Sequence, residues 1–171
     1  MKNNILIILT AILTGCGFGV GSHGSIKGYQ YPVTKSELEK AVMTVLQNKT
    51  NVYRDTIRNY MIDVTNGKND TIENNYYNDG KNYLTIHIKT SDNLTDYTFR
   101  YLGDSLTWAN SPTSEIFICY IYDTKGNGGS EGNGKWGQTS SSTQTIMINL
   151  FEKEFIDKLD KELNKKHTEI N

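Results

Sequence analysis

Two side chains in the middle of the sequence, Cys119 and His87, are of the types that form nucleophilic pairs in enzymes. A catalytic thiol needs a nearby base and an electropositive, partly open setting. Cys119 instead lies in the apolar run 118–121, and His87 falls on the polar side of an alternating segment. We therefore expect a buried structural cysteine and a surface histidine rather than a catalytic pair.

A second stretch, residues 123–134, has the Asp, Asn and Gly of a calcium-binding loop at loop positions one, five and six. However, Lys125 occupies a ligand position, and Gly134 stands where a bidentate glutamate belongs. The interpretation we favour is a glycine-rich surface loop over residues 126–137. No motif for a metal or for another cofactor is evident, so we expect no cofactor.

A third reactive side chain, Cys16, ends the tetrapeptide Leu-Thr-Gly-Cys at residues 13–16. Lys2 gives the preceding segment a positive start, and residues 5–13 form a short apolar core. That core has about half of the ~20 residues needed to cross a bilayer, which argues against a membrane span. A positive start, a short apolar core and a small-residue site are typical of a cleavable secretory signal.

This arrangement resembles the signal peptide and lipobox of bacterial lipoproteins. The resemblance implies that residues 1–15 are removed and that Cys16 is acylated, so that lipid holds the mature chain to a membrane. Several acyl chains anchor a protein stably, whereas one chain gives only marginal binding. A plain secretory signal is the alternative, and it would leave Cys16 as an unexplained thiol. With Cys16 acylated, Cys119 is the only remaining thiol, so no intramolecular disulfide forms.

The residues that follow the cysteine indicate a tether and a location. Residues 16–31 are rich in glycine, which predicts a flexible lipidated linker. Neither an acidic run nor an aspartate follows Cys16 directly. Among bacterial lipoproteins these absences favour the outer membrane, with the protein facing the periplasm.

Length and composition limit what the rest of the chain does. The chain has 171 residues, of which 36% are hydrophobic, and this predicts a single folded domain over residues 32–171. Lys and Arg number 18 against 19 Asp and Glu, with no basic stripe. We therefore expect no nucleic-acid partner.

Two helices are predicted from capping residues and apolar spacing. Thr34 and Glu37 form a capping box, and apolar residues at helical spacing follow as far as residues 48–50. Near the end of the chain, Asn149 and Glu152 form a second plausible cap. An amphipathic helix with apolar residues from Leu150 onward is expected to follow.

Between these helices the apolar period changes to two, which is typical of strands. The turn residues 78–80 (Asn-Asp-Gly) separate residues 72–77 from residues 83–90 and predict a hairpin between them. Alternation continues over residues 97–101.

Three other segments complete the strand prediction. Residues 116–122 are apolar on both faces, which predicts a central strand covered on each side. Residues 143–148 are predicted to be a last strand. Residues 52–64 fit either a short helix or a strand, with a strand favoured at their end. The fold class is therefore α+β, with an antiparallel sheet of about four to six strands and an N-terminal and a C-terminal helix packed on one face.

Aromatic residues are the main signal for a binding surface. Trp108, Trp136, Tyr76 and Tyr77 lie in or beside predicted loops and hairpin ends, where amphipathic rings often contact partners. The alternative is ordinary core or sheet packing, because aromatic residues are also good strand formers.

Three further residues lie in triplets of Asp, Ser or Thr, and an aliphatic residue. Thr56, Thr71 and Ser105 are the central residues. The triplets are similar to an O-glycosylation motif that some Gram-negative bacteria use on exported proteins.

The sequence thus leads to three hypotheses of function. The first is a lipid-anchored binding or assembly module that contacts another envelope protein. The second is an immunity-type lipoprotein that neutralises a periplasmic toxin. The third is an enzyme acting on envelope material, for which His87, Asp96 and Arg100 are the residues to substitute, although no catalytic motif is present.

Overall fold

The computed structural model describes most of the second half of the chain and parts of the first, namely residues 26–48, 51–54, 60–63, 70–73, 83–130 and 136–170. The predicted signal peptide, Cys16, Thr56, Tyr76 and Tyr77 lie outside these ranges. Within the ranges, no helix reaches the length and apolar content that crossing a membrane requires.

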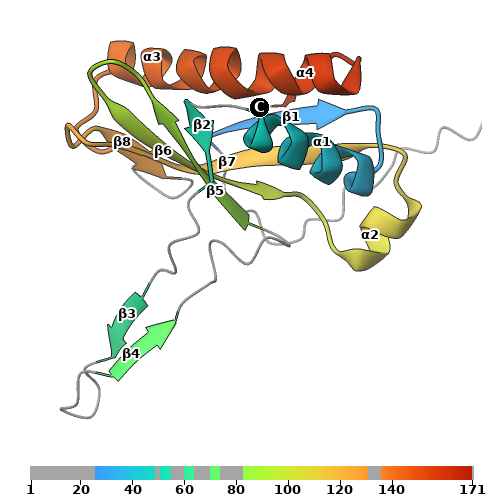
Figure 1. Ribbon diagram of the computed structural model, residues 1–171, viewed down its shortest axis with the longest axis horizontal. Helices are drawn as coiled ribbons and strands as arrows, with labels where there is room; N and C mark the ends of the chain where they lie inside the picture. The colour runs from blue at the N-terminus through green and yellow to red at the C-terminus, as the bar shows by residue number, and fades with distance from the viewer. Residues whose placement is uncertain are drawn as a thin grey trace, which may run out of the picture.

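A seven-stranded antiparallel sheet forms the centre of the fold, in the order β2-β5-β6-β7-β1-β9, with β8 beside β7 (Figure 1). Its strands are β1 Lys27–Tyr31, β2 Val52–Tyr53, β5 Tyr83–Lys89, β6 Leu94–Tyr101, β7 Ser114–Asp123, β8 Gly128–Ser130 and β9 Thr168–Ile170. A separate two-stranded pair consists of β3 Tyr60–Asp63 and β4 Asp70–Glu73. The alternating burial of β5 and β6 gives the sheet one apolar face.

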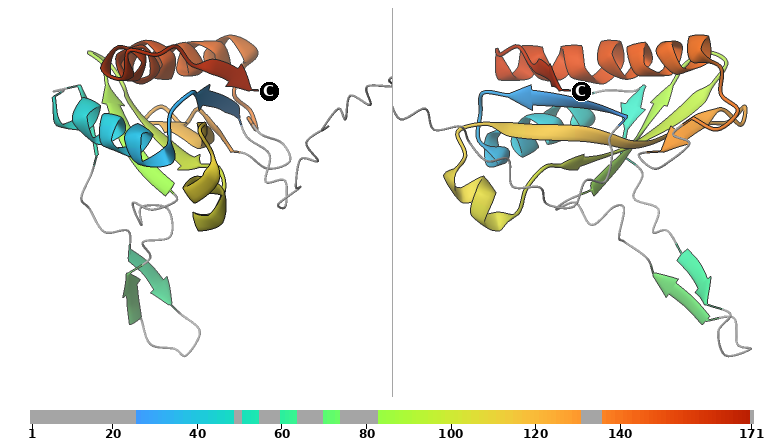
Figure 2. Two further views of the ribbon diagram at one scale, coloured as in Figure 1. Left: turned by 90° about the vertical axis from the view of Figure 1, so that its right-hand side faces the viewer. Right: turned by 180° about the vertical axis from the view of Figure 1, so that it is seen from behind.

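The helices that cover this apolar face come from the two ends of the domain. They are α1 Lys35–Gln47 and a C-terminal rod made of α3 Ser141–Phe151, a π-helical turn Glu152–Ile156 and α4 Asp157–Leu163. Figures 1 and 2 show both on one side of the sheet, and α1 contacts α4. The short α2, Ser105–Asn110, lies apart in the connection from β6 to β7. The predicted α+β class, with both terminal helices on one face, is confirmed.

Aromatic rings join the C-terminal rod to the sheet. The ring of Phe151 lies 5.0 Å from that of Tyr97 and 5.9 Å from that of Tyr29, measured between centroids, and Phe155 lies 5.4 Å from Phe99. All five side chains are fully buried. The Tyr97 hydroxyl also donates a hydrogen bond of 2.8 Å to the Met147 carbonyl, which satisfies its polar group inside the core.

The N-terminal helix begins where its capping box predicts. The Thr34 hydroxyl accepts from the Glu37 amide, and the Glu37 carboxylate accepts from the Thr34 amide at 2.9 Å. The residues that α1 buries are those of the predicted apolar stripe: Leu38, Ala41, Val42, Val45 and Leu46.

The boundary between tether and domain lies earlier than the sequence indicated. Residues 27–31, assigned to the tether, form β1 inside the sheet, with Tyr29 and Tyr31 fully buried. The nearby glycines suggested flexibility, but Gly28 has a packing role. A Cβ atom at Gly28 would lie 2.4 Å from the Phe117 ring, so only glycine fits beneath that ring.

Most of the first arm and the turn of the predicted hairpin between residues 72–77 and 83–90 lie outside the described residues, which omit 74–82. The two described residues of that arm, 72 and 73, pair in β4 with β3, whereas β5 pairs with β2 and β6. A turn signal specifies only local chain reversal, and burial of the apolar face of β5 decides which neighbours this strand takes. The strand favoured at the end of residues 52–64 is confirmed as β3.

The predicted strand over residues 143–148 is also wrong, because these residues lie in α3. The C-terminal helix therefore begins at Ser141 and not after the predicted cap Asn149, and the Ser140 hydroxyl accepts from the Thr143 amide. Met147 and Phe151, four residues apart, are the residues that α3 buries. Their burial outweighs the strand preference of the β-branched residues around them.

The apolar run 116–122 has a different cause from the one predicted. The register between β6 and β7 shifts by one residue: Tyr120 pairs with Thr98, and Ile118 pairs with Phe99. Cys119 is therefore the extra residue of a β-bulge. Before the bulge Ile118 faces the core, and after the bulge Ile121 does so, whereas Tyr122 is exposed. The run is therefore apolar because the strand changes phase, and β7 is not covered equally on both faces.

Candidate functional site

Polar and aromatic side chains share the sheet face opposite α1, α3 and α4, which we call the outer face. Directly paired residues of neighbouring strands point to the same side of a sheet, so the strand register identifies the members of this face. Among the outer-face residues are Tyr53 of β2, Tyr83, Thr85 and His87 of β5, Asp96, Thr98 and Arg100 of β6, and Phe117, Tyr120 and Tyr122 of β7.

One row of the outer face runs through four strands and joins a histidine to a carboxylate. Tyr53 pairs with His87, His87 with Asp96, and Asp96 with Tyr122. His87 Nδ1 lies 2.6 Å from Asp96 Oδ1, and the Tyr53 ring stacks on the imidazole at 5.2 Å and 28°. The His87 side chain is 14% exposed, whereas that of Asp96 is 48% exposed. The row therefore presents a carboxylate held from one side by histidine.

Tyr122 completes this row because the facing residue on β8 is a glycine. A Cβ atom at Gly128 would lie 2.3 Å from Cδ1 of Tyr122, so the ring lies directly over the glycine backbone. Tyr122 is 51% exposed, and Tyr53 at the other end of the row is 37% exposed. Two tyrosines thus flank the histidine and the carboxylate, and the strands fix their backbones.

The next rows of the outer face separate Arg100 from this pair. The hydroxyls of Thr85 and Thr98 lie 2.8 Å apart, and Arg100 comes one rung further, with its guanidinium 5.9 Å from the Phe117 ring centroid. Four residues along β6 place Arg100 about 13 Å from Asp96. The structure therefore brings His87 and Asp96 together, and it does not join Arg100 to them.

The two predicted aromatic residues that the structure describes, Trp108 and Trp136, lie in different segments. Trp108 lies on α2, and its indole donates to the Leu102 carbonyl at 2.7 Å, with Lys35 Nζ 4.2 Å from the ring centroid. Trp136 lies three residues before Thr139, which bonds Gly128 of β8 opposite Tyr122, near the other end of β7. Both tryptophans pack against the core. Core packing, the alternative to a binding surface, therefore describes Trp108 and Trp136.

Two other sequence signals have local structural explanations. Asp123, the first residue of the supposed calcium loop, accepts from the amides of Lys125 and Asn127 and from the side chain of Asn93. Burial works against the charged form, but these hydrogen bonds hold the pKa of Asp123 below its ordinary value. Its carboxylate therefore closes a turn. Cys119 is fully buried, as expected for a structural thiol.

The glycosylation candidates differ in their settings. Ser105 is the exposed first residue of α2, and the preceding Asp104 caps that helix by accepting from the Thr107 amide at 2.8 Å. Thr71 lies on β4. Asp104, the first residue of this triplet, therefore has a structural role as the cap of α2.

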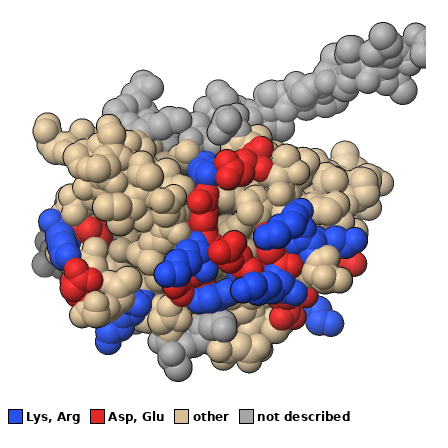
Figure 3. Space-filling model, turned by 90° about the horizontal axis from the view of Figure 1, so that it is seen from above, with Lys and Arg blue, Asp and Glu red and all other residues tan. Residues whose placement is uncertain are grey.

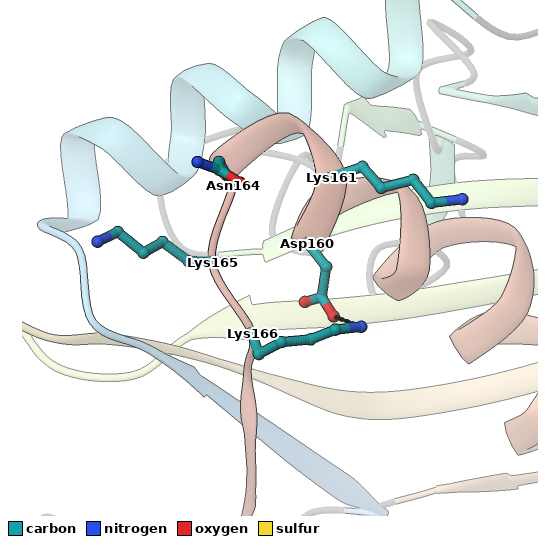
Figure 4. Close-up of a pocket in the computed structure, with 5 residues that line it drawn as sticks. All are labelled: Asp160, Lys161, Asn164, Lys165 and Lys166. Atoms are coloured by element: carbon teal, nitrogen blue, oxygen red, sulfur yellow. Dashed lines mark hydrogen bonds and ion pairs between the residues drawn. The ribbon is translucent and has the colours of Figure 1, made fainter.

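A shallow hollow of about 260 Å³ lies at the end of α4, next to a buried carboxylate (Figure 4). The Asp160 side chain is 3% exposed, and it lies 3.0 Å from both Lys166 Nζ and His167 Nδ1. Burial opposes ionisation, yet these hydrogen bonds hold the pKa of Asp160 below its ordinary value. Figure 4 shows Lys161 and Lys165 pointing away from each other. These two cations do not converge on a common ligand, and the cluster instead fixes the C-terminal segment.

A second ionic cluster joins β1 to the same C-terminal segment. Lys27 Nζ lies 2.5 Å from a Glu152 oxygen and 3.0 Å from a Glu169 oxygen, and the Tyr29 hydroxyl donates to Glu152. Elsewhere on the helical face, Lys and Arg side chains alternate with Asp and Glu, as in the pair Lys158 and Glu154 (Figure 3). These contacts are structural, which leaves the outer face as the candidate site.

Comparison with known proteins gives no further assignment. No family model matches the chain, and none of the curated proteins or solved structures compared with it matches.

Sequence reasoning missed Tyr53 and Tyr122 as site residues. Tyr122 belongs to an apolar run whose phase depends on the bulge at Cys119. Tyr53 lies in the segment that fitted both helix and strand. One signal was available, because His87 and Asp96 both fall on the polar side of alternating segments.

Proposed function

We propose that this chain is a lipid-anchored protein of the bacterial cell envelope whose domain binds a partner protein through the outer face. The observation that carries the binding proposal is the row from Tyr53 to Tyr122, which exposes two tyrosine rings and one carboxylate on a sheet. Tyrosine supplies large contact area at a low cost in conformational entropy, and such residues dominate binding surfaces.

The sequence next to this row supports recognition of a protein. Residues 126–151 contain only two charged side chains, Glu131 and Lys135, among many Gly, Ser, Thr and Asn residues. Within this segment, the Thr139 hydroxyl accepts a hydrogen bond from the Gly128 amide and donates one to the Gly128 carbonyl, both at 2.9 Å. These bonds hold β8 next to the start of α3. Tyrosine beside adaptable small polar residues is the composition of antibody binding loops.

The anchoring part of the proposal rests on residues 13–16 and on the length of chain that follows. Nine residues, 17–25, separate the acylation site Cys16 from the first described residue of the domain, Ile26. A fully extended chain from Cys16 to Ile26 spans at most ~35 Å. The domain would therefore work close to a membrane surface, and we place it on the outer membrane, facing the periplasm.

The two parts of the proposal are tested separately. Substitution Cys16→Ser should move the protein from the membrane fraction to the soluble fraction and remove the mass of the acyl chains. If the variant stays with sedimented envelopes at an unchanged mass, the anchoring proposal is wrong.

Affinity purification from detergent extracts tests the binding part. The wild type should retain a stoichiometric partner, and the double variant Tyr53→Ala/Tyr122→Ala should lose it. Met43→Ala is the matched control, because Met43 is a large side chain on α1 with a similar exposure of 39%. An envelope protein as partner would indicate assembly, and a toxin would indicate immunity. Equal retention by all three proteins would refute docking on the outer face.

A further inference from the structure

We infer that the partner presents a basic side chain, best an arginine, to Asp96, between the ring of Tyr122 and the stacked pair of Tyr53 and His87. This inference rests on the proposed function, and it names the partner chemistry that the same face would recognise. It follows from three features of the row: one available carboxylate oxygen, aromatic rings on both sides, and the placement of neighbouring charges.

The carboxylate of Asp96 is only partly used within the domain. Oδ1 lies 2.6 Å from His87 Nδ1, and in the described part of the chain no hydrogen bond reaches Oδ2. The side chain is 48% exposed. A half-exposed carboxylate fixed by a neighbour on one side is pre-oriented to accept hydrogen bonds from a guanidinium or an ammonium.

Aromatic rings flank this carboxylate on both neighbouring strands. Tyr122 faces Asp96 on β7, and His87 faces it on β5 with the Tyr53 ring stacked at 5.2 Å. Directly paired residues have Cβ atoms about 5 Å apart, so the side chain of Tyr122 borders the space above Asp96, and its ring leans toward Gly128 on the opposite side of β7. A planar guanidinium also stacks on aromatic rings while it bonds a carboxylate, which favours arginine over lysine.

Other charges near the row weaken the attraction between Asp96 and a partner's cation but do not cancel it. Lys89 lies on the same side of β5 as His87, two residues away, and is exposed. Two residues of a strand correspond to about 7 Å, so Lys89 repels an incoming cation moderately. Asp92 pairs with Lys125 at 3.1 Å and therefore does not add to the attraction. Replacement Lys89→Gln should accordingly strengthen the binding of a cation.

The experiment is an NMR titration of the full chain carrying Cys16→Ser. The probe is the blocked tripeptide Gly-Arg-Gly, and its control carries citrulline, the neutral isostere of arginine. Signals of residues 87, 96 and 122 should shift saturably with the arginine peptide, and the citrulline peptide should bind about five-fold more weakly. Asp96→Asn should weaken arginine binding by about three- to ten-fold, while Asp92→Asn, which removes an exposed charge that pairs with Lys125, should leave it unchanged.

The outcomes separate this inference from the proposed function. Equal shifts with arginine and citrulline in the Cys16→Ser protein would overturn the inference, even if the purified partner depended on Tyr53 and Tyr122. Equal losses for Asp96→Asn and Asp92→Asn would also overturn it, because they would indicate a general charge effect. Arginine selectivity that depends on Asp96 supports the inference, and it does so whether or not a partner is captured from extracts. The comparison of the two peptides needs no substitution on the outer face, so it holds even if Asp96→Asn fails to fold.

Discussion

Replacement of Asp160 by asparagine tests how the C-terminal segment is held to the domain. The carboxylate is almost fully buried and contacts Lys166 and His167, which lie just before β9. Asparagine keeps the size of the side chain but removes its charge. We expect Asp160→Asn to lower the free energy of unfolding by about 2 to 3 kcal/mol at pH 7, the range for a buried hydrogen bond to a charged group.

Lys166 and His167 should contribute unequally to this loss of stability. The Lys166 side chain is 82% exposed, and exposed ion pairs contribute only about 0–1 kcal/mol. The His167 side chain is 18% exposed, and its ring also packs at 5.4 Å from the Tyr29 ring. A double-mutant cycle should therefore give a coupling energy of about 1 kcal/mol for Asp160 with His167 and a smaller coupling for Asp160 with the exposed Lys166.

The pH dependence follows from the lowered pKa of Asp160. Its contribution is fully present above the unfolded pKa of about 3.9, and it disappears as the pH falls through the lower pKa of the folded state. Urea unfolding from pH 7 to pH 3 should show the difference between the wild type and Asp160→Asn shrinking below about pH 4. A difference that stays constant down to pH 3, or a larger loss for Lys166→Ala than for His167→Ala, would refute the reasoning.

Three further predictions concern the core. Gly28→Ala should cost about 1–3 kcal/mol in thermal unfolding, because the new Cβ would lie 2.4 Å from the Phe117 ring, and adding Phe117→Leu should restore part of the loss. Tyr97→Phe should cost about 1 kcal/mol in urea unfolding because the Met147 carbonyl loses its 2.8 Å donor; an unchanged midpoint would contradict that contact. The buried Cys119 thiol should react with a thiol reagent at least about 100-fold more slowly than in the unfolded chain, measured in a protein lacking the other cysteine, and rapid labelling would show that β7 is open.

The elements that sequence reasoning predicted well are those with local determinants. A capping box and five apolar residues at helical spacing define α1, because each contact lies within one or two turns. The alternation of β5 is likewise local and correctly assigned its buried residues Leu84, Ile86 and Ile88. The errors concern long-range packing. Met147 and Phe151 make α3 helical by their burial, and the pairing partner of β5 is chosen by the sheet as a whole.

The candidate site was predicted only in part for the same reason. The polar side of the alternating segments identified His87 and Asp96 as surface residues, but their contact depends on the register between β5 and β6. Tyr122 reaches the outer face through the bulge at Cys119, which no local pattern announces. Trp108 and Trp136 attracted attention by residue type, yet Trp108 lies on α2 before the start of β7, and Trp136 follows β8, which pairs with the end of β7.

Photocrosslinking in intact cells tests the central claim, docking on the outer face, most directly. A benzophenone side chain replaces Tyr122 in one protein and Met43 in another, which compares the outer face with the helical face at similar initial exposure. We expect one discrete crosslinked protein from position 122, and none or only a diffuse background from position 43. The same discrete product from both positions, or a product from position 43 alone, would contradict docking of a partner on the outer face.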